Sequence, residues 1–215
     1  MRFIDLKNRE VLNILERVRY LYREKYDMTK ITRQNGIGKR AEDYTSLEYM
    51  KEVVAMGQRH DGFPRQSKAF PLKPENAKNK PLSYQADYDE WNTRLRTELG
   101  VKHCALSQLY PPGGFIDWHN NANASSFNII FTWNETGDGR FKWLDPDGET
   151  IHEMKDKKGW SAKCGYFARY EEENNPDAPL VYHCASTESW RITVSYILGF
   201  SEDYWEDMIE HLENE

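Results

Sequence analysis

The chain has 215 residues, enough for one domain with a substantial hydrophobic core. Its composition, 39% hydrophobic and 30% charged, excludes wholesale disorder, and no apolar run approaches membrane-spanning length. The N-terminus has no apolar signal core, and the three cysteines lack CxxC spacing. These features predict a soluble cytoplasmic protein with reduced thiols and no disulfide framework.

The net charge of −6 is unevenly distributed. Residues 1–80 carry 18 Lys and Arg against 11 Asp and Glu, and the remainder carries 11 against 24. We interpret the excess of Lys and Arg in residues 1–80 as a solvated, loop-rich surface, because these cations are too sparse for a nucleic-acid-binding arm. We therefore expect neither nucleic acid nor membrane as a partner, although the first part could attract another anionic partner. The charge distribution does not decide among the small-molecule and peptide substrates.

The first hundred residues predict helices and loops. Residues 8–26 place apolar side chains at three- and four-residue steps, which indicates an amphipathic helix. Residues 27–82 are interrupted by Gly and Pro and predict long ordered loops, with a short helix near 45–56. A second long helix is expected over 84–99, ended by Gly100. This part, 1–100, is expected to pack on the core of a single domain, 1–215.

Residues 101–200 are typical of β-structure. Eight short segments rich in β-branched and aromatic residues are separated by Gly, Pro, Asn or Asp turns. They predict a mainly β sandwich or jelly roll with flanking helices. A final helix, 201–215, follows an expected N-cap at Ser201. The eight predicted strands are 101–110, 114–119, 126–133, 140–144, 149–154, 160–170, 178–184 and 190–200.

Two histidines occur where strands meet loops. His119 ends GGFIDWH, and His183 ends LVYH some sixty residues later. Strand ends at one rim of a closed β architecture converge on one pocket, so the pair is a candidate metal site. Neutral imidazole binds Fe, Zn, Cu and Ni alike, and the histidines alone do not select the metal.

Arg191 narrows the chemistry of this site. It follows His183 by eight residues, and the two-residue period of a strand puts Arg191 and Thr193 on one face. An inward guanidinium in an apolar strand is costly unless it meets an anion, best a carboxylate that it can bind with two donors. Two His ligands with an Arg anchor predict a metal site that binds a dicarboxylate co-substrate.

Four segments resemble the Fe(II)/2-oxoglutarate-dependent oxygenases, in particular their prolyl-4-hydroxylase-like and aspartyl/asparaginyl-hydroxylase-like branches. They are LYPPGGFIDWHNN, GDGRFKWLDPDGE, KCGYFARY and YHCASTESWRITVSY, all within residues 100–200. The resemblance implies a double-stranded β-helix core of the cupin-like jelly-roll type. It also implies Fe(II), 2-oxoglutarate and O2 as cofactor and co-substrates, and a dioxygenase that hydroxylates an unactivated C–H bond.

The same resemblance assigns roles to individual residues. His119 and His183 would bind the metal, and Arg191 with Thr193 would hold the C5 carboxylate of 2-oxoglutarate. Tyr110 matches a tyrosine that hydrogen-bonds the same carboxylate in some members. Asn128, together with Thr132 on the same strand face, would complete the pocket.

One position departs from the family pattern. The third metal ligand is usually the carboxylate of an H-x-D or H-x-E motif, and here that position is Asn121. Three interpretations stay open: Asn121 coordinates weakly, water fills the third position, or Asp117 supplies the charge from the same strand face as His119. An open position also resembles the halogenase variants of the family. A jelly-roll binding or structural module without turnover is the alternative from another functional class. The expected substrate is a peptide, an amino acid or another small polar molecule.

Overall fold

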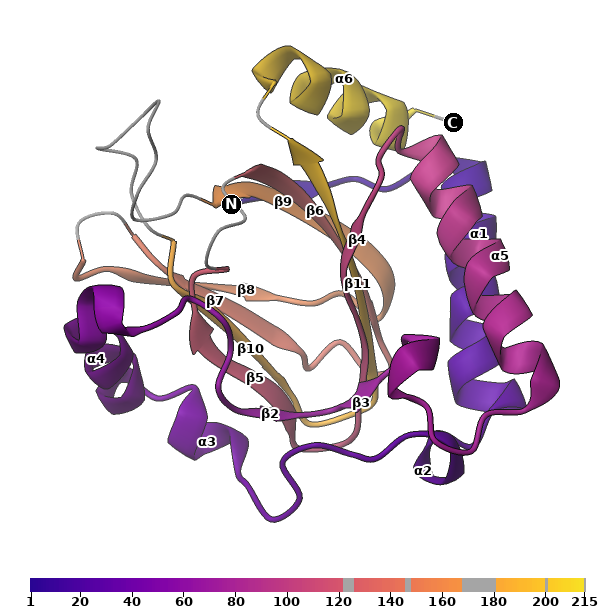
Figure 1. Cartoon of the computed structure of the whole chain (residues 1–215). Coiled ribbons are helices and arrows are strands. Elements are labelled where there is room, and N and C mark those ends of the chain that lie inside the picture. Colours follow the sequence, from indigo (N-terminus) through magenta and orange to yellow (C-terminus); the bar gives the residue numbers. More distant parts are fainter. Residues whose placement is uncertain (122–125, 146–147, 168–180, 200, 215) are drawn as a thin grey trace.

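The structure is a computed structural model and describes residues 1–121, 126–145, 148–167, 181–199 and 201–214. Two antiparallel sheets face each other, and helices cover their outer surfaces (Figure 1). The strands of the described residues are β1 (Arg2–Ile4), β2 (Ser67–Lys68), β3 (Phe70–Pro71), β4 (Cys104–Tyr110), β5 (Gly114–His119), β6 (Ser126–Asn134), β7 (Arg140–Leu144), β8 (Ile151–Lys155), β9 (Gly159–Phe167), β10 (His183–Thr187) and β11 (Arg191–Gly199). The helices are α1 (Arg9–Tyr20), continued by a π-helical turn (Leu21–Lys25), α2 (Met28–Ile31), α3 (Ala41–Tyr44), α4 (Leu47–Met56), α5 (Leu82–Glu98) and α6 (Glu202–Glu213), with 3-10 turns at Gly57–Arg59 and Pro74–Asn76.

The eight strands β4–β11 wind between the two sheets. The large sheet has the order β1-β9-β6-β11-β4-β3, and the small sheet has the order β2-β5-β10-β7-β8. Except for β7 and β8, which form a hairpin in the small sheet, successive strands from β4 to β11 alternate between the two layers. This winding is that of a double-stranded β-helix, so the predicted fold class is confirmed.

Residues 27–82, expected as loops with one short helix, also extend both sheets. β2 pairs with β5 at the edge of the small sheet, and β3 pairs with β4 at the edge of the large sheet. The expected short helix near 45–56 is α4, capped by the Ser46 hydroxyl, which accepts from the backbone N–H of Tyr49 at 3.1 Å. Strand β1, which the sequence did not indicate, pairs with β9.

Helices α1, α5 and α6 pack on the outer face of the large sheet (Figure 1). The apolar stripe of α1 (Val11, Ile14, Leu15 and Val18) is fully buried in one core with Trp91 and Leu95 of α5 and residues of β6, β9 and β11. Gly100 ends α5 with a positive φ of 59°, as expected of a residue after a helix C-terminus. Ser201 caps α6 by accepting from the N–H of Tyr204 at 3.2 Å, which confirms the predicted start of that helix.

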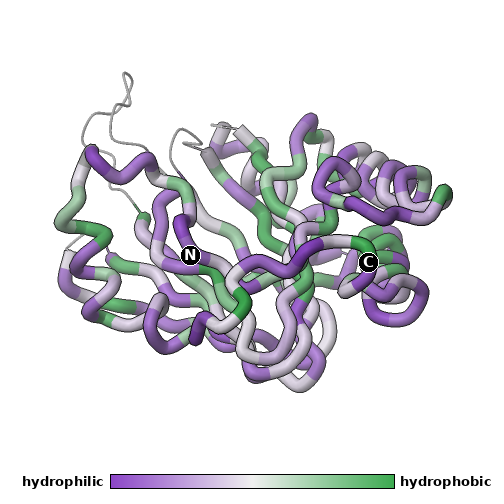
Figure 2. The backbone as a smooth tube through the Cα atoms, turned by 60° about the horizontal axis from the view of Figure 1, so that its bottom comes forward, coloured by the Kyte–Doolittle hydropathy of each residue, from purple (hydrophilic) through white to green (hydrophobic). Residues whose placement is uncertain are grey.

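Helix α4 covers the outer face of the small sheet. Its Met50 and Val53 form a second core with Trp118 of β5 and Cys184 of β10. Hydrophobic and hydrophilic stretches alternate along the tube in Figure 2. Among the described residues, no helix combines the length and apolar character needed to cross a bilayer.

Three predicted strands have an end that the structure shifts or that lies outside the described residues. His183 begins β10, whereas the sequence placed it at the end of a strand over 178–184; residues 178–180 lie outside the described residues. The predicted ends of 160–170 and 190–200, and residue 215 of the last helix, also fall outside the described ranges.

Candidate active site

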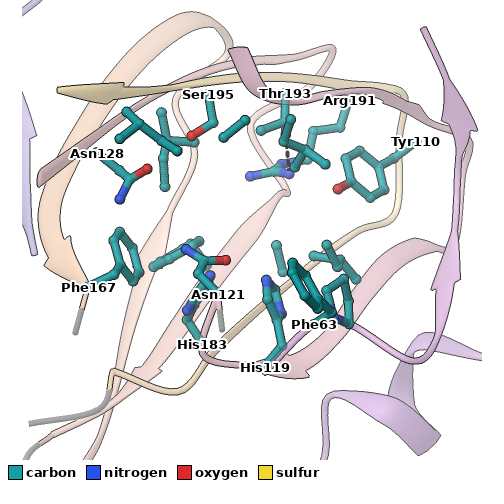
Figure 3. A pocket seen from close by; sticks show the side chains of 18 residues that line it. Phe63, Tyr110, His119, Asn121, Asn128, Phe167, His183, Arg191, Thr193 and Ser195 are labelled. Carbon is teal, nitrogen blue, oxygen red and sulfur yellow. Dashed lines mark hydrogen bonds between the residues drawn. The ribbon is translucent and has the colours of Figure 1, made fainter. Parts of the chain in front are cut away.

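A cavity of about 360 Å³ lies between the inner faces of the two sheets (Figure 3). Its size falls in the range of small-molecule sites. Strands of both sheets contribute to its wall, together with two residues from the segment that precedes β2. The described residues that line it are Phe63, Pro64, Ala105, Leu106, Tyr110, Ile116, His119, Asn121, Asn128, Ile130, Phe141, Phe167, His183, Ala185, Arg191, Thr193, Ser195 and Ile197.

The structure brings His119 and His183 together in this wall. They are directly opposite residues of β5 and β10, and their ring centroids are 4.2 Å apart. Both are buried, at 4% and 5% exposure. The expected convergence of two strand ends on one pocket is therefore present in the structure.

Both imidazoles are held in one tautomer by the same kind of contact. His119 Nδ1 lies 2.7 Å from the carbonyl oxygen of Asp117, and His183 Nδ1 lies 3.0 Å from that of Val181. A carbonyl can only accept, so Nδ1 carries the proton and Nε2 keeps the lone pair. Burial lowers the pKa of His119 to about 4, although its hydrogen bonds to the Asp117 carbonyl and to Asn121 act in the opposite direction. Burial also lowers the pKa of His183 well below its usual value. The pair is neutral near pH 7, as metal ligands must be.

Asn121 lies beside the two histidines in the cavity wall, whereas Asp117 points from β5 toward Tyr49 of α4 and away from the cavity. Asn121 lines the cavity and has a φ of 63°, a left-handed conformation that Asn tolerates better than most residues. Asp117 does not line the cavity: its Oδ2 accepts from the Tyr49 hydroxyl at 3.0 Å and from the Gln66 backbone N–H at 2.9 Å. Burial raises the pKa of Asp117 to about 6. Across the described ranges, no group of three or more His, Cys, Asp or Glu gathers around a possible metal position.

A β-bulge explains why Asp117 and His119 do not share a face. His183 pairs with His119, and Ala185 pairs with Ile116. An advance of two residues along β10 is therefore matched by three residues along β5, which has one extra residue. The extra residue shifts the alternation, and Ile116 and His119 both face the cavity while Trp118 packs under α4. The expectation that Asp117 shares the face of His119 is wrong for this reason. The same sheet geometry places Cys184, next to His183, in the core under α4 and away from the cavity.

Arg191 and Thr193 share the inner face of β11, as the two-residue period predicted. The odd-numbered residues from Arg191 to Ile197 line the cavity, whereas Ile192, Val194 and Tyr196 enter the core under the helices. Arg191 is 2% exposed. Its Nη1 donates to the Thr193 hydroxyl at 2.6 Å, and its Nη2 lies 3.4 Å from the Thr132 hydroxyl.

Tyr110 stands next to Arg191 on the adjacent strand. The two residues are paired between β4 and β11, and the guanidinium lies 5.4 Å from the tyrosine ring centroid. The Tyr110 hydroxyl is buried and has no hydrogen-bond partner among the described residues. Burial raises the pKa of Tyr110, so the hydroxyl keeps its proton. An unpartnered O–H beside a guanidinium suits an anionic acceptor.

Asn128 lies at the other end of the cavity from Arg191 (Figure 3). On the paired strands β6 and β11, six residues separate the Arg191–Asn134 pair from the Ile197–Asn128 pair. That is roughly 20 Å at about 3.4 Å per residue. The Nδ2 of Asn128 donates to the backbone oxygen and the hydroxyl of Ser126, both at 3.1 Å. Asn128 thus lines the end of the cavity away from Arg191, whereas Thr132 does not line the cavity and contacts Arg191 through its hydroxyl.

Two charged residues behind Arg191 were missed from the sequence. Asp156, just after β8, accepts from Arg191 Nε at 2.7 Å, and Lys163 of β9 donates to the same carboxylate at 2.7 Å. Both side chains are fully buried. The two-residue period of β9 could have indicated that Lys163 faces the cavity side, because it falls on the same face as Phe167. Nothing in MKDKKG distinguishes Asp156 from an ordinary turn residue.

Comparison with known proteins gives distant likenesses. No family model matches the sequence, and no curated protein does. Among solved structures, a prolyl-4-hydroxylase of Pseudomonas putida matches with a TM-score of 0.41 at 12% identity, over 91% of this chain and 90% of that chain. A rice dioxygenase for auxin oxidation matches with a TM-score of 0.35 at 13% identity, over 72% of this chain and 69% of that chain. Similarities at this level carry no argument about the reaction.

Proposed function

We propose that this chain is an Fe(II)- and 2-oxoglutarate-dependent oxygenase that hydroxylates a C–H bond. The observation that carries the proposal is one cavity that joins two neutral, oriented imidazoles with a buried guanidinium and an unpartnered tyrosine hydroxyl. A metal-binding group and a carboxylate-binding group in the same wall suit a co-substrate that contacts both.

The histidine pair and Asn121 fit a metal ion. His119 and His183 offer Nε2 lone pairs because their Nδ1 atoms are occupied by backbone carbonyls. The Asn121 amide oxygen is the remaining protein donor that we assign to the metal, with water completing the shell. When bound here, Fe(II) would supply the redox chemistry that couples O2 and 2-oxoglutarate to substrate oxidation.

Arg191, Thr193 and Tyr110 fit the distal carboxylate of 2-oxoglutarate. A guanidinium has five N–H donors, and hydrogen bonds within the protein use three of those of Arg191. Two donors are left for a ligand, and the Tyr110 hydroxyl adds a third. The role of these residues is to bind and orient the co-substrate from a wall in which Arg191 and Tyr110 are both buried.

The opposite end of the cavity suits an uncharged part of a substrate. Arg191 is the only described lining residue with a permanent charge. Around Asn128 and Ser195 the wall is otherwise apolar, with Leu106, Ile197 and Phe167. Phe63, which is 57% exposed, reaches the cavity from the surface. We infer that the substrate, a peptide, an amino acid or another small polar molecule, inserts an uncharged group here.

Binding of metal and co-substrate tests the proposal without knowledge of the substrate. Anaerobic Fe(II) with 2-oxoglutarate should give a visible charge-transfer band in the wild-type protein. His119→Ala and His183→Ala should each remove tight Fe(II) or Mn(II) binding in calorimetric titration and leave the fold intact. His152→Ala, at a half-exposed histidine bonded to Asp145, is the matched control and should bind metal normally.

The absence of both the band and metal binding in the wild type would refute the oxygenase. A binding module without turnover, suggested by Asn121 in the place of a carboxylate, would bind 2-oxoglutarate but form no succinate. A halogenase would give a chlorinated product in the presence of chloride.

A further inference from the structure

Three charged side chains are buried together at the Arg191 end of the cavity. Arg191 Nε and Lys163 Nζ each donate at 2.7 Å to a different oxygen of Asp156. The side chains of Lys163 and Asp156 are 0% exposed, and that of Arg191 is 2% exposed. We call these three residues the buried charge triad.

Asp156 fixes the direction of the Arg191 guanidinium. It engages Nε, while Thr193 and Thr132 contact the two terminal nitrogens from the side. Each terminal nitrogen therefore keeps one N–H, and the guanidinium lines the cavity. A guanidinium whose Nε is already held by a hydrogen bond loses less conformational freedom when its terminal nitrogens bind a carboxylate.

Lys163 decides the charge of this end of the cavity. With Arg191 alone, Asp156 would form a neutral pair that has little attraction for another anion. With Lys163 protonated, the triad has two cations and one carboxylate, a net charge of +1. Burial lowers the pKa of Lys163, and the ion pair with Asp156 opposes that shift. Arg191 and Lys163 together outweigh the effect of burial and lower the pKa of Asp156 to about 2, so the carboxylate is ionised. A buried net charge without a counterion is costly, and one further anion relieves that cost.

The position of Lys163 keeps its charge close to the cavity without exposing it. Its Nζ lies 5.4 Å from the ring centroid of Phe141, whose side chain lines the cavity. It also lies 3.4 Å from the Thr132 hydroxyl, which Arg191 shares. Lys163 thus acts on a ligand through the field of the triad and not through contact.

We propose that Asp156 and Lys163 are positioning residues that make the Arg191 end of the cavity a binding site for a single carboxylate. Asp156 holds Arg191 in its binding orientation, and Lys163 offsets the charge of Asp156 so that Arg191 stays available to the ligand. The proposal rests on the proposed function, since it takes that carboxylate to be the distal one of a 2-oxo diacid. It predicts strong preference for 2-oxoglutarate over 2-oxopentanoate, which has a methyl group where 2-oxoglutarate has the carboxylate.

The test separates charge from orientation with two variants. Lys163→Met keeps the side-chain length and lowers the net charge of the triad to zero. Asp156→Ala combined with Lys163→Met restores the net charge of +1 but removes the acceptor that orients Arg191. Calorimetry with Mn(II)-loaded protein measures the affinities for 2-oxoglutarate and 2-oxopentanoate, and thermal melting checks the fold. The control pair is Arg140→Met with Glu153→Gln, which removes an exposed ion pair on the β7–β8 hairpin.

Both variants should weaken 2-oxoglutarate by about tenfold or more, the scale of one charge-assisted hydrogen bond. Their affinity for 2-oxopentanoate and for Mn(II) should stay near that of the wild type, as should all affinities of the control pair. A Lys163→Met protein that binds 2-oxoglutarate like the wild type would overturn the charge role. A double variant that does so would overturn the orienting role of Asp156. If Lys163→Met fails to fold, Lys163→Gln, which also lowers the net charge of the triad to zero, tests the charge role in its place. If the wild type binds no 2-oxoglutarate, the proposed function itself fails.

Discussion

The Tyr110 hydroxyl is the clearest single-residue sign of a ligand in this protein. It is buried in the cavity wall without a hydrogen-bond partner among the described residues, and such a group carries a desolvation cost of about 1–3 kcal/mol. The hydroxyl of Tyr84, also buried, donates to the Leu72 carbonyl at 2.8 Å. The hydroxyl of Tyr84 is thus satisfied within the protein, whereas that of Tyr110, beside Arg191, has no partner among the described residues.

Tyr110→Phe should lower the affinity for 2-oxoglutarate without lowering stability, and Tyr84→Phe should lower stability without changing the affinity. Tyr110→Phe removes a donor to a carboxylate, about 1.5–3 kcal/mol, so 2-oxoglutarate should bind roughly ten- to a hundredfold more weakly. The unliganded stability should not fall, because no internal bond is lost. Tyr84→Phe should cost about 1 kcal/mol of unfolding free energy and leave the affinity unchanged. Urea denaturation and calorimetric titration of both variants measure the two effects. Loss of unliganded stability in Tyr110→Phe would show that its hydroxyl has a structural partner.

Strand β11 of the large sheet serves two purposes, one on each face. On β11, Arg191 and Thr193 face the cavity, while Ile192 and Val194 are fully buried against the helices. The sequence predicted this division because a period of two residues follows from strand geometry alone. It did not predict the bulge in β5, because a bulge depends on how two strands pair and leaves no mark in GFIDWH.

Neighbouring substitutions on β11 should separate binding from stability. Thr193→Val removes the hydroxyl that accepts from Arg191 Nη1 and should weaken 2-oxoglutarate by several-fold. Val194→Ala removes two buried methyl groups from the core under the helices and should cost about 2 kcal/mol of unfolding free energy. It should leave the affinity for 2-oxoglutarate unchanged. Urea unfolding and calorimetry on the same samples would show the separation, and a large affinity loss in Val194→Ala would contradict it.

At the scale of the whole molecule, the sequence was most informative where short-range patterns determine structure. The eight core strands, the long helices, and the presence of His119, His183 and Arg191 in one pocket follow from periodicity, turn residues and the costs of burial. The buried charge triad did not, because Asp156 and Lys163 meet Arg191 only through the pairing of β6 with β9 and β11 and the turn after β8. The edge strands β2 and β3 were missed because two residues are too few to show a period.

Enclosure of the triad has a consequence for how the protein responds to ionic strength. Mobile ions screen exposed charges within about 8 Å at physiological salt, but they act much less on buried ones. The net charge of −6 also means that long-range forces repel a dicarboxylate, and salt weakens that repulsion. From about 50 to about 500 mM NaCl, the 2-oxoglutarate dissociation constant should therefore change by less than about twofold. Titrations at both concentrations would check this, and a steep loss of affinity would place the anion at the surface. The proposed site should therefore be as full of 2-oxoglutarate in concentrated salt as in dilute salt.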